Sequence, residues 1–328
     1  MRRWSRRDLL RRLGVGGAAV LGAGLVGSAR AEDQAERYRR AVGISPLHRA
    51  GLYGGAADPP AWMGPEALDA VTAPPVVSSR GRQIIEMTVM ERTLEVAEGV
   101  FFDAWTYDGT VPGPTLRATE GDVLEIRFRN RTDRPHNLHF HGRHAPTQDG
   151  WEPVPPGGEA TYEIVAGPAG LHPYHCHVMP LQVHVARGLY GLLIVDPPTP
   201  RPAAQEVVLM LSGFEVDGQP NAVVAWNGVA GFYERFPIKV QAGEPVRVYL
   251  ANVLEYEPVG SFHLHAETFR VFPTGIGAAP TFETDVVTLG QMDRAVLEFT
   301  LPEPGRYMFH PHQHWLAERG AVGWFAAV

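Results

Sequence analysis

The feature that most constrains the fold is an internal repeat. Three segments in the first half of the chain have counterparts, in the same order, in the second half. Residues 117–130 correspond to 239–252, 137–143 to 261–267, and 165–178 to 301–314. A chain of 328 residues is long enough for two domains with their own cores. The repeat therefore predicts a duplication of one domain of about 115–130 residues.

The repeated unit has the pattern of β-structure. The segment VLEIRFRN at 123–130 alternates apolar and charged side chains, as a half-buried antiparallel strand does. The chain also contains 36 glycines and 29 prolines, which favours many short strands joined by turns. A proline-rich linker at 196–202 separates the two units as a stiff, extended connector. The predicted fold class is all-β, with a first domain at 81–198 and a second at 199–328.

The N-terminus predicts export. Residues 1–31 contain the pair Arg6-Arg7, a small apolar run and then Ala29-Arg30-Ala31, which fits a cleavage site. This is the pattern of a twin-arginine signal peptide, so we expect a periplasmic or secreted protein. An uncleaved membrane anchor is the alternative, but the run is short and glycine-rich for a span. Residues 32–80 are interpreted as an extension that wraps or docks.

Composition narrows the partners. The net charge is −7 and the mature part has no basic stripe, which argues against nucleic acid. No stable membrane anchor is expected either.

The stretch at 171–191 indicates a metal site. It holds the single cysteine, Cys176, between His175 and His177, with His184 a short loop further on. If YHCHV forms a strand, the two flanking histidines share one face and Cys176 points to the other. A thiolate with two imidazoles is the equatorial ligand set of a blue-copper centre. A free cysteine buried in a core is the alternative interpretation.

Four His-x-His pairs lie at repeat-related positions. They are His139 with His141, His175 with His177, His263 with His265, and His310 with His312. On a strand, both imidazoles of a pair point the same way. Eight histidines in four such pairs match the ligand count of a three-copper cluster.

The two halves differ where a mononuclear site would lie. In the first half the relevant residues are His136, Cys176, His184 and Leu189. In the second half the corresponding residues are Gly260, Pro311, one near Leu316 and one near Ala321. None of the second set can bind copper, so the sequence predicts one mononuclear site, made of His136, Cys176 and His184.

On these motifs the chain resembles a two-domain multicopper oxidase over residues 83–328, of the laccase-like kind whose type 1 copper lies in the N-terminal domain. It is more distantly similar to copper nitrite reductases. The resemblance implies two tandem cupredoxin-like Greek-key β-sandwich domains and about four coppers per chain. It also implies a homotrimer, in which the first domain of one subunit and the second domain of its neighbour share each trinuclear site.

The resemblance also assigns the ligands. His136, Cys176 and His184 would bind the type 1 copper, and His139 and His263 the type 2 copper. The type 3 pair would be bound by His141, His175, His177, His265, His310 and His312. Cys176 and its two neighbouring histidines form the implied electron path from the type 1 copper to the cluster.

The implied activity is one-electron oxidation of a donor coupled to reduction of dioxygen to water. The donor would be a small molecule such as a phenol, or a metal ion. The alternatives are a copper nitrite reductase and a copper-binding or electron-transfer protein without turnover. Nitrite reductases have an acidic residue where this chain has His139, and they lack the second histidine of the His-Cys-His motif, which favours the oxidase.

The remaining assignments are less constrained. Leu189 stands at the axial position of the type 1 site and cannot ligate, and Met179 is the competing candidate. Proton relay to the cluster could involve Glu267, Asp149 or Asp122. His144 and His172 are interpreted as exposed loop histidines, and the tryptophans, Trp105 among them, as core or rim residues.

Overall fold

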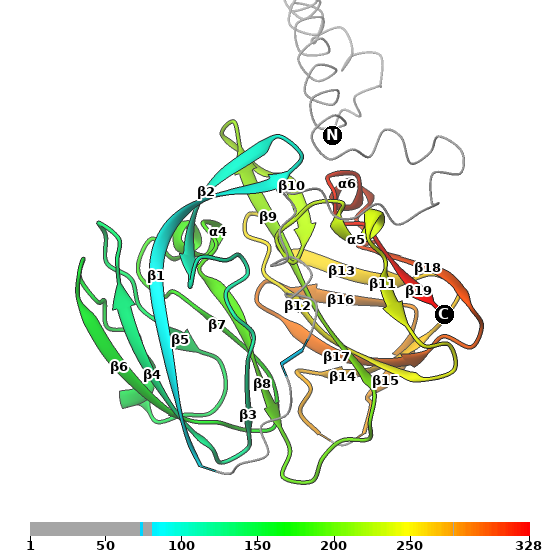
Figure 1. Ribbon diagram of the computed structural model, residues 1–328, viewed down its shortest axis with the longest axis horizontal. Coiled ribbons are helices and arrows are strands. Elements are labelled where there is room, and N and C mark those ends of the chain that lie inside the picture. Colours follow the sequence, from blue (N-terminus) through cyan, green and yellow to red (C-terminus); the bar gives the residue numbers. More distant parts are fainter. Residues whose placement is uncertain (1–72, 75–80, 278) are drawn as a thin grey trace, which may run out of the picture.

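The computed structural model describes residues 73–74, 81–277 and 279–328 (Figure 1). The predicted signal peptide and most of the predicted extension lie outside the described residues. Within the described ranges, no helix is long and apolar enough to span a membrane.

The first half forms a sandwich of two four-stranded sheets, ordered β2-β1-β4-β6 and β3-β8-β7-β5. Its strands are β1 (Arg82–Ala97), β2 (Val100–Tyr107), β3 (Leu116–Thr119), β4 (Val123–Asn130), β5 (His139–Phe140), β6 (Glu159–Val165), β7 (Gly170–His175) and β8 (Tyr190–Asp196). A 3-10 turn, η1 (Pro146–Gln148), and the helix α4 (Leu181–Ala186) occupy the loops.

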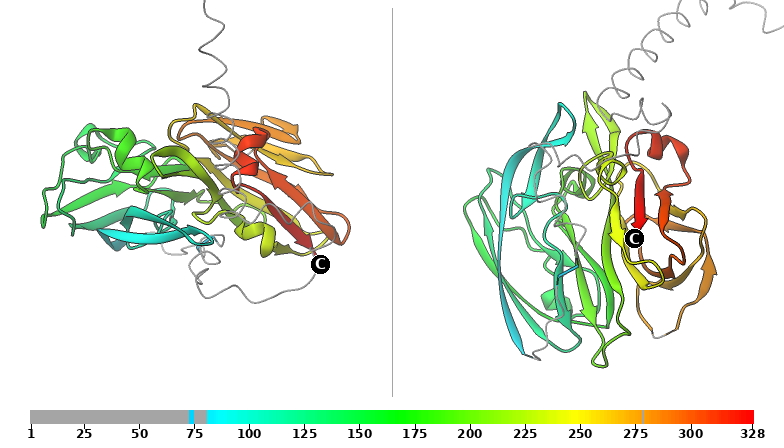
Figure 2. Two further views of the ribbon diagram at one scale, coloured as in Figure 1. Left: turned by 90° about the horizontal axis from the view of Figure 1, so that it is seen from above. Right: turned by 45° about the vertical axis from the view of Figure 1, so that its right-hand side comes forward.

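The second half forms a larger sandwich, with sheets ordered β10-β9-β12-β17-β14-β15 and β11-β19-β18-β13-β16. Its strands are β9 (Gln205–Val216), β10 (Gln219–Trp226), β11 (Ile238–Val240), β12 (Pro245–Asn252), β13 (Val259–Leu264), β14 (Phe269–Pro273), β15 (Phe282–Thr284), β16 (Val286–Gly290), β17 (Arg294–Thr300), β18 (Gly305–His310) and β19 (Gly323–Ala327). The helices are α5 (Phe232–Arg235) and α6 (His314–Glu318). The two halves lie side by side (Figures 1 and 2), and the predicted all-β fold of two tandem sandwiches is confirmed.

The apolar core consists of three clusters, one inside each sandwich and one between them. One fills the first sandwich around Leu124, Ile126 and Phe128, and a second fills the other sandwich. The third lies between the halves, where Leu192 of β8 packs in one cluster with Met210 of β9. Because burial of such side chains contributes about 1.5–3 kcal/mol each, the third cluster fixes the two sandwiches relative to each other.

The pairing of β4 differs partly from the expectation. Leu124, Ile126 and Phe128 are buried as predicted, and β4 pairs antiparallel with β6. On its other edge, however, β4 pairs parallel with β1. The alternating pattern reports which face is buried and carries no information about the direction of the neighbouring strand.

The internal repeat is visible in the backbone. Arg187, Gly188 and Leu189 after α4 have the same roles as Arg319, Gly320 and Ala321 after α6: Leu189 N–H donates to His184 O, and Ala321 N–H donates to Leu316 O. Gly188 and Gly320 both have positive φ, +114° and +118°, which glycine adopts without strain.

This match aligns His184 with Leu316 and Leu189 with Ala321, as the sequence comparison predicts.

The predicted strand YHCHV is wrong in its extent. β7 ends at His175, although Cys176 N–H still donates to the carbonyl of Leu189, the residue just before β8. Beyond it the chain turns through Pro180, which lacks an N–H for the ladder, and begins α4. His184, predicted to follow a short loop, lies on this short helix.

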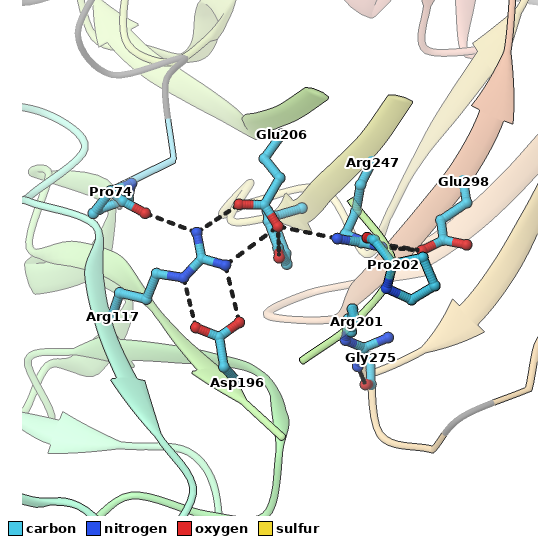
Figure 3. A network of polar contacts seen from close by, with 10 residues as sticks. Pro74, Arg117, Asp196, Arg201, Pro202, Glu206, Arg247, Gly275 and Glu298 are labelled. Carbon is cyan, nitrogen blue, oxygen red and sulfur yellow. Dashed lines mark hydrogen bonds and ion pairs between the residues drawn. The ribbon is translucent and has the colours of Figure 1, made fainter. Parts of the chain in front are cut away.

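A buried ionic network also joins the halves (Figure 3). Arg117 of β3 forms a two-bond pair with Asp196, at 2.7 and 2.9 Å, and also donates to Glu206 of β9. Glu206 in turn accepts from Arg247, which also pairs with Glu298. Arg117 has only 3% of its side chain exposed, so these charges depend on one another for solvation.

Arg117→Ala is expected to lower the free energy of unfolding by about 3 kcal/mol, because it removes the arginine that pairs with Asp196 and one of the two arginines that pair with Glu206 in a poorly solvated site. Urea unfolding followed by tryptophan fluorescence measures this. The control is Arg127→Ala, since Arg127 is 47% exposed and forms only surface pairs, worth about 0–1 kcal/mol. Equal losses in the two variants would contradict the role assigned to the network.

Candidate metal centres

The first centre consists of one thiol and two imidazoles that converge inside the first sandwich. Cys176 Sγ lies 3.2 Å from His184 Nδ1 and 3.8 Å from His136 Nδ1, and the two Nδ1 atoms lie 3.2 Å apart. The three residues come from the segment after β7, from α4 and from the segment before β5. All three are buried.

These three atoms fit a first-row metal ion. A point equidistant from them lies about 2.0 Å from each, which matches bond lengths of about 2.0 Å to imidazole nitrogen and about 2.3 Å to thiolate sulfur seen with zinc. The donor set of one thiolate and two imidazoles is that of a blue-copper centre.

The electrostatics suit metal binding. Burial lowers the pKa of His136 to about 3, and it also lowers the pKa of His184, so both imidazoles keep free lone pairs at neutral pH. Burial raises the pKa of the Cys176 thiol to about 11. A metal ion binding there would therefore displace a proton from sulfur.

The two axial candidates lie in different places. Leu189 is fully buried in the same apolar cluster as Cys176. Met179 is 77% exposed and lines a surface pocket with the paired histidines of the first half.

The second centre is a group of histidines at the outer edge of β5 and β7. His141 Nε2 lies 3.1 Å from His175 Nε2, and the ring centroid of His139 lies 5.2 Å from that of His175 and 5.3 Å from that of His177. Burial, and to a smaller extent the neighbouring imidazole of His175, lowers the pKa of His141 to about 3.

The third centre repeats this arrangement in the second half. His265 Nε2 lies 3.0 Å from His310 Nε2, and the His263 ring lies 5.4 Å from that of His310 and 5.1 Å from that of His312. In each half, the first histidine of the late pair comes from the end of a strand, β7 or β18, and the second lies just beyond it.

Backbone carbonyls fix the tautomers of four of these histidines. The Nδ1 atoms of His139 and His263 lie 2.8 Å from the carbonyl oxygens of Asp149 and Asp285. Those of His175 and His310 lie 2.9 and 2.8 Å from the carbonyls of residues 176 and 311. A carbonyl only accepts, so each Nδ1 carries the proton and each Nε2 presents a lone pair to a metal.

The second and third centres are separate within one chain. Among the described residues, no group with potential ligand atoms within 4.8 Å of one another combines histidines from both halves. Each centre also opens to its own pocket, lined in one case by the first-half histidines and in the other by His263 and His265.

The three carboxylates proposed for proton relay lie in different places. Asp149 lies beside the second centre, with Oδ1 3.4 Å from His139 Nδ1 and 3.5 Å from His144 Nε2. Glu267 lines the pocket of the third centre. The Asp122 carboxylate instead accepts from the backbone N–H groups of Gly81 and Thr119, so it holds a turn.

The expectation that His172 is an exposed loop residue is wrong. It lies on β7 and is buried, because its position on the strand points it into the first sandwich.

Sequence reasoning missed the groups that orient the metal-binding side chains. The carbonyls of Asp149 and Asp285 have no sequence signal, since any residue supplies a carbonyl. Trp105, interpreted as core or rim, packs edge-on against both imidazoles of the first centre, with ring centroids 5.2 Å from His136 and 4.9 Å from His184.

Comparison with known proteins identifies the class. Family models described as multicopper oxidase match residues 88–200 and 200–328. A crystal structure of a multicopper oxidase is 40% identical, with a TM-score of 0.76, covering 81% of this chain and 97% of that one. The copper-containing nitrite reductase of Neisseria meningitidis serogroup A is 32% identical over 290 residues, 78% of this chain and 74% of that protein.

A copper nitrite reductase structure from Nitrosomonas europaea is 29% identical, with a TM-score of 0.68, and covers 75% of this chain and 94% of that one. The chain belongs to the multicopper oxidase family, and it is an oxidoreductase of that family related to copper nitrite reductases and laccases. Copper is the metal that this membership implies, and the donor sets described above fit it.

Proposed function

We propose that this chain is a laccase-like multicopper oxidase, which couples one-electron oxidation of a donor to the four-electron reduction of dioxygen to water. Copper, when bound, would supply the redox chemistry. The chain's residues would hold the metals and provide the covalent path between them.

The observation that carries this proposal is the matched pair of histidine centres. Each half contributes four histidines, and in each half two of them are fixed by backbone carbonyls so that Nε2 faces the metal position. Together they supply eight imidazoles, the number that a three-copper cluster uses. We assign His139 and His263 to the type 2 copper and the other six to the type 3 pair.

Since the two histidine centres are separate within one chain, we propose that they meet across subunits. The first-half centre of one subunit would face the second-half centre of its neighbour, and a closed ring of three chains satisfies every such contact. The protein would thus be a homotrimer with about four coppers per chain.

The type 1 centre would be the site where the donor's electron enters. Cys176 is covalently adjacent to both His175 and His177, so the chain supplies a path of few bonds from the thiolate to the cluster ligands. The Leu189 side chain has no donor atom for a copper held by His136, Cys176 and His184, which would favour a high reduction potential. Small phenol-like molecules and metal ions are the proposed donors. From the twin-arginine pattern at the N-terminus we also propose that the enzyme is exported to the periplasm or secreted.

Nitrite reduction is the second candidate, because the Neisseria relative is a nitrite reductase that matches most of the chain. That reaction needs only a single type 2 copper besides the type 1 copper. His139 and His177 would then have no metal role, although both lie in the second centre, the histidine group of the first half.

Copper content separates the candidates. Protein loaded with copper and freed of excess metal is expected to contain about four coppers per chain by elemental analysis. About two would favour nitrite reductase, and one would leave an electron carrier. A matched control is His263→Ala/His265→Ala, which should lose cluster copper and keep the type 1 copper, because these histidines lie in the other half from Cys176.

A further inference from the structure

The type 1 centre is covered by a stacked pair of side chains. Trp105 of β2 packs edge-on against the rings of both His136 and His184. On Trp105 lies the guanidinium of Arg134, whose Cζ is 4.9 Å from the ring centroid. His136 is fully buried and His184 nearly so, whereas Arg134 has 47% of its side chain exposed. The stack therefore connects the imidazoles to the surface.

The backbone of Arg134 is held in place. Its carbonyl accepts hydrogen bonds from Asn130 Nδ2 at 2.7 Å and from Thr132 Oγ1 at 3.0 Å, and both of those residues are buried. Arg134 is also only two residues before His136. The backbone from which the Arg134 side chain extends is thus fixed relative to the metal position, and the guanidinium itself is held by its contact with the Trp105 ring.

The internal repeat provides a comparison within the molecule. Trp105 N–H donates to Arg187 O, and Val224 N–H donates to Arg319 O, so Val224 is the counterpart of Trp105. With His136 aligned to Gly260, the counterpart of Arg134 is Pro258. The half without a mononuclear site therefore has neither member of the stack.

We propose that Arg134, seated on Trp105, is a tuning residue that raises the reduction potential of the copper held by His136, Cys176 and His184. A fixed positive charge disfavours the more highly charged oxidised metal relative to the reduced one. This inference rests on the proposed type 1 copper and adds a residue outside its ligand set.

Two carboxylates oppose Arg134. Asp133 Oδ1 lies 2.9 Å from Arg134 Nε, and Glu91 Oε1 lies 3.8 Å from it. Both are more than half exposed, so they offset part of the charge and not all of it. Neutralising Asp133 should therefore move the potential in the direction opposite to neutralising Arg134.

The test is a redox titration of the copper-loaded protein, followed by the visible absorption of the copper–thiolate bond. At the wild-type midpoint, Arg134→Gln is expected to raise the ratio of oxidised to reduced type 1 copper about threefold to fivefold. Asp133→Asn should lower it, and Arg134→Lys should keep a ratio close to wild type. The matched control, Arg127→Gln, removes an arginine of equal exposure from surface pairs on β4 and should leave the ratio unchanged.

An unchanged ratio in Arg134→Gln, or an equal change in Arg127→Gln, would overturn the inference about Arg134. The proposed function would stand in that case, provided that the wild type shows copper–thiolate absorption and oxygen uptake. A wild-type protein without copper–thiolate absorption would overturn both. Because Arg134 is exposed, its variants should unfold at the wild-type temperature, which thermal melting verifies.

Discussion

Cys176→Ser is expected to abolish the copper–thiolate absorption and to reduce donor-dependent oxygen uptake by at least about 10³-fold. Serine has nearly the same shape but supplies no thiolate, so the site of His136 and His184 loses its anionic ligand. The direct connection from the type 1 centre to His175 and His177 is lost with it. Oxygen uptake measured with an excess of donor gives the loss.

The control for this variant is the copper of the histidine cluster. Cys176 faces the apolar core of the first sandwich, on the side opposite to His175 and His177, so the cluster should keep about three coppers per chain. Oxygen uptake at the wild-type rate in Cys176→Ser would show that the donor's electrons do not enter at this centre.

Two inactive chains are expected to form an active assembly when they are combined. His139→Ala/His141→Ala damages the first-half centre, and His263→Ala/His265→Ala damages the second-half centre. In a mixed ring of three chains, one interface of the three joins an intact first half to an intact second half. Co-expressed chains with different tags, purified through both, should therefore show about one third of wild-type activity per assembly.

Each variant alone should be inactive, and each should still form the ring, which size measurement in solution verifies. A doubly purified mixed assembly without activity would mean that both histidine centres must come from one chain. That result would contradict the proposed sharing of the cluster between subunits.

The alternation of apolar and charged side chains and the internal repeat predict the fold, because both depend on which side chains are buried. The alternation in 123–130 identifies the buried face of β4, and the matched segments identify the second sandwich. Strand direction is not recorded in that pattern, which is why the parallel pairing of β4 with β1 was not predicted.

The histidine pairs predict which side chains come together, because side chains two apart on a strand share a face. The rule puts His139 and His141 on one face, and the pairing of β5 with β7, which only the structure shows, brings His141 beside His175. The carbonyls that fix His139 and His263 come from loops, and loop geometry leaves no trace in residue type. The contact of Trp105 with His136 and His184 is seen only in the structure. Its counterpart in the second half, Val224, is likewise identified only by the matching backbone hydrogen bond.

The most direct test of the central claim is the stoichiometry between donor oxidised and dioxygen consumed by the copper-loaded protein. The proposed oxidase requires four one-electron oxidations per dioxygen, with water as the product and no hydrogen peroxide. A ratio of four that is lost in the His139→Ala/His141→Ala variant is the predicted result. A ratio of two with hydrogen peroxide, or donor oxidation that proceeds only with nitrite and yields nitric oxide, would contradict it.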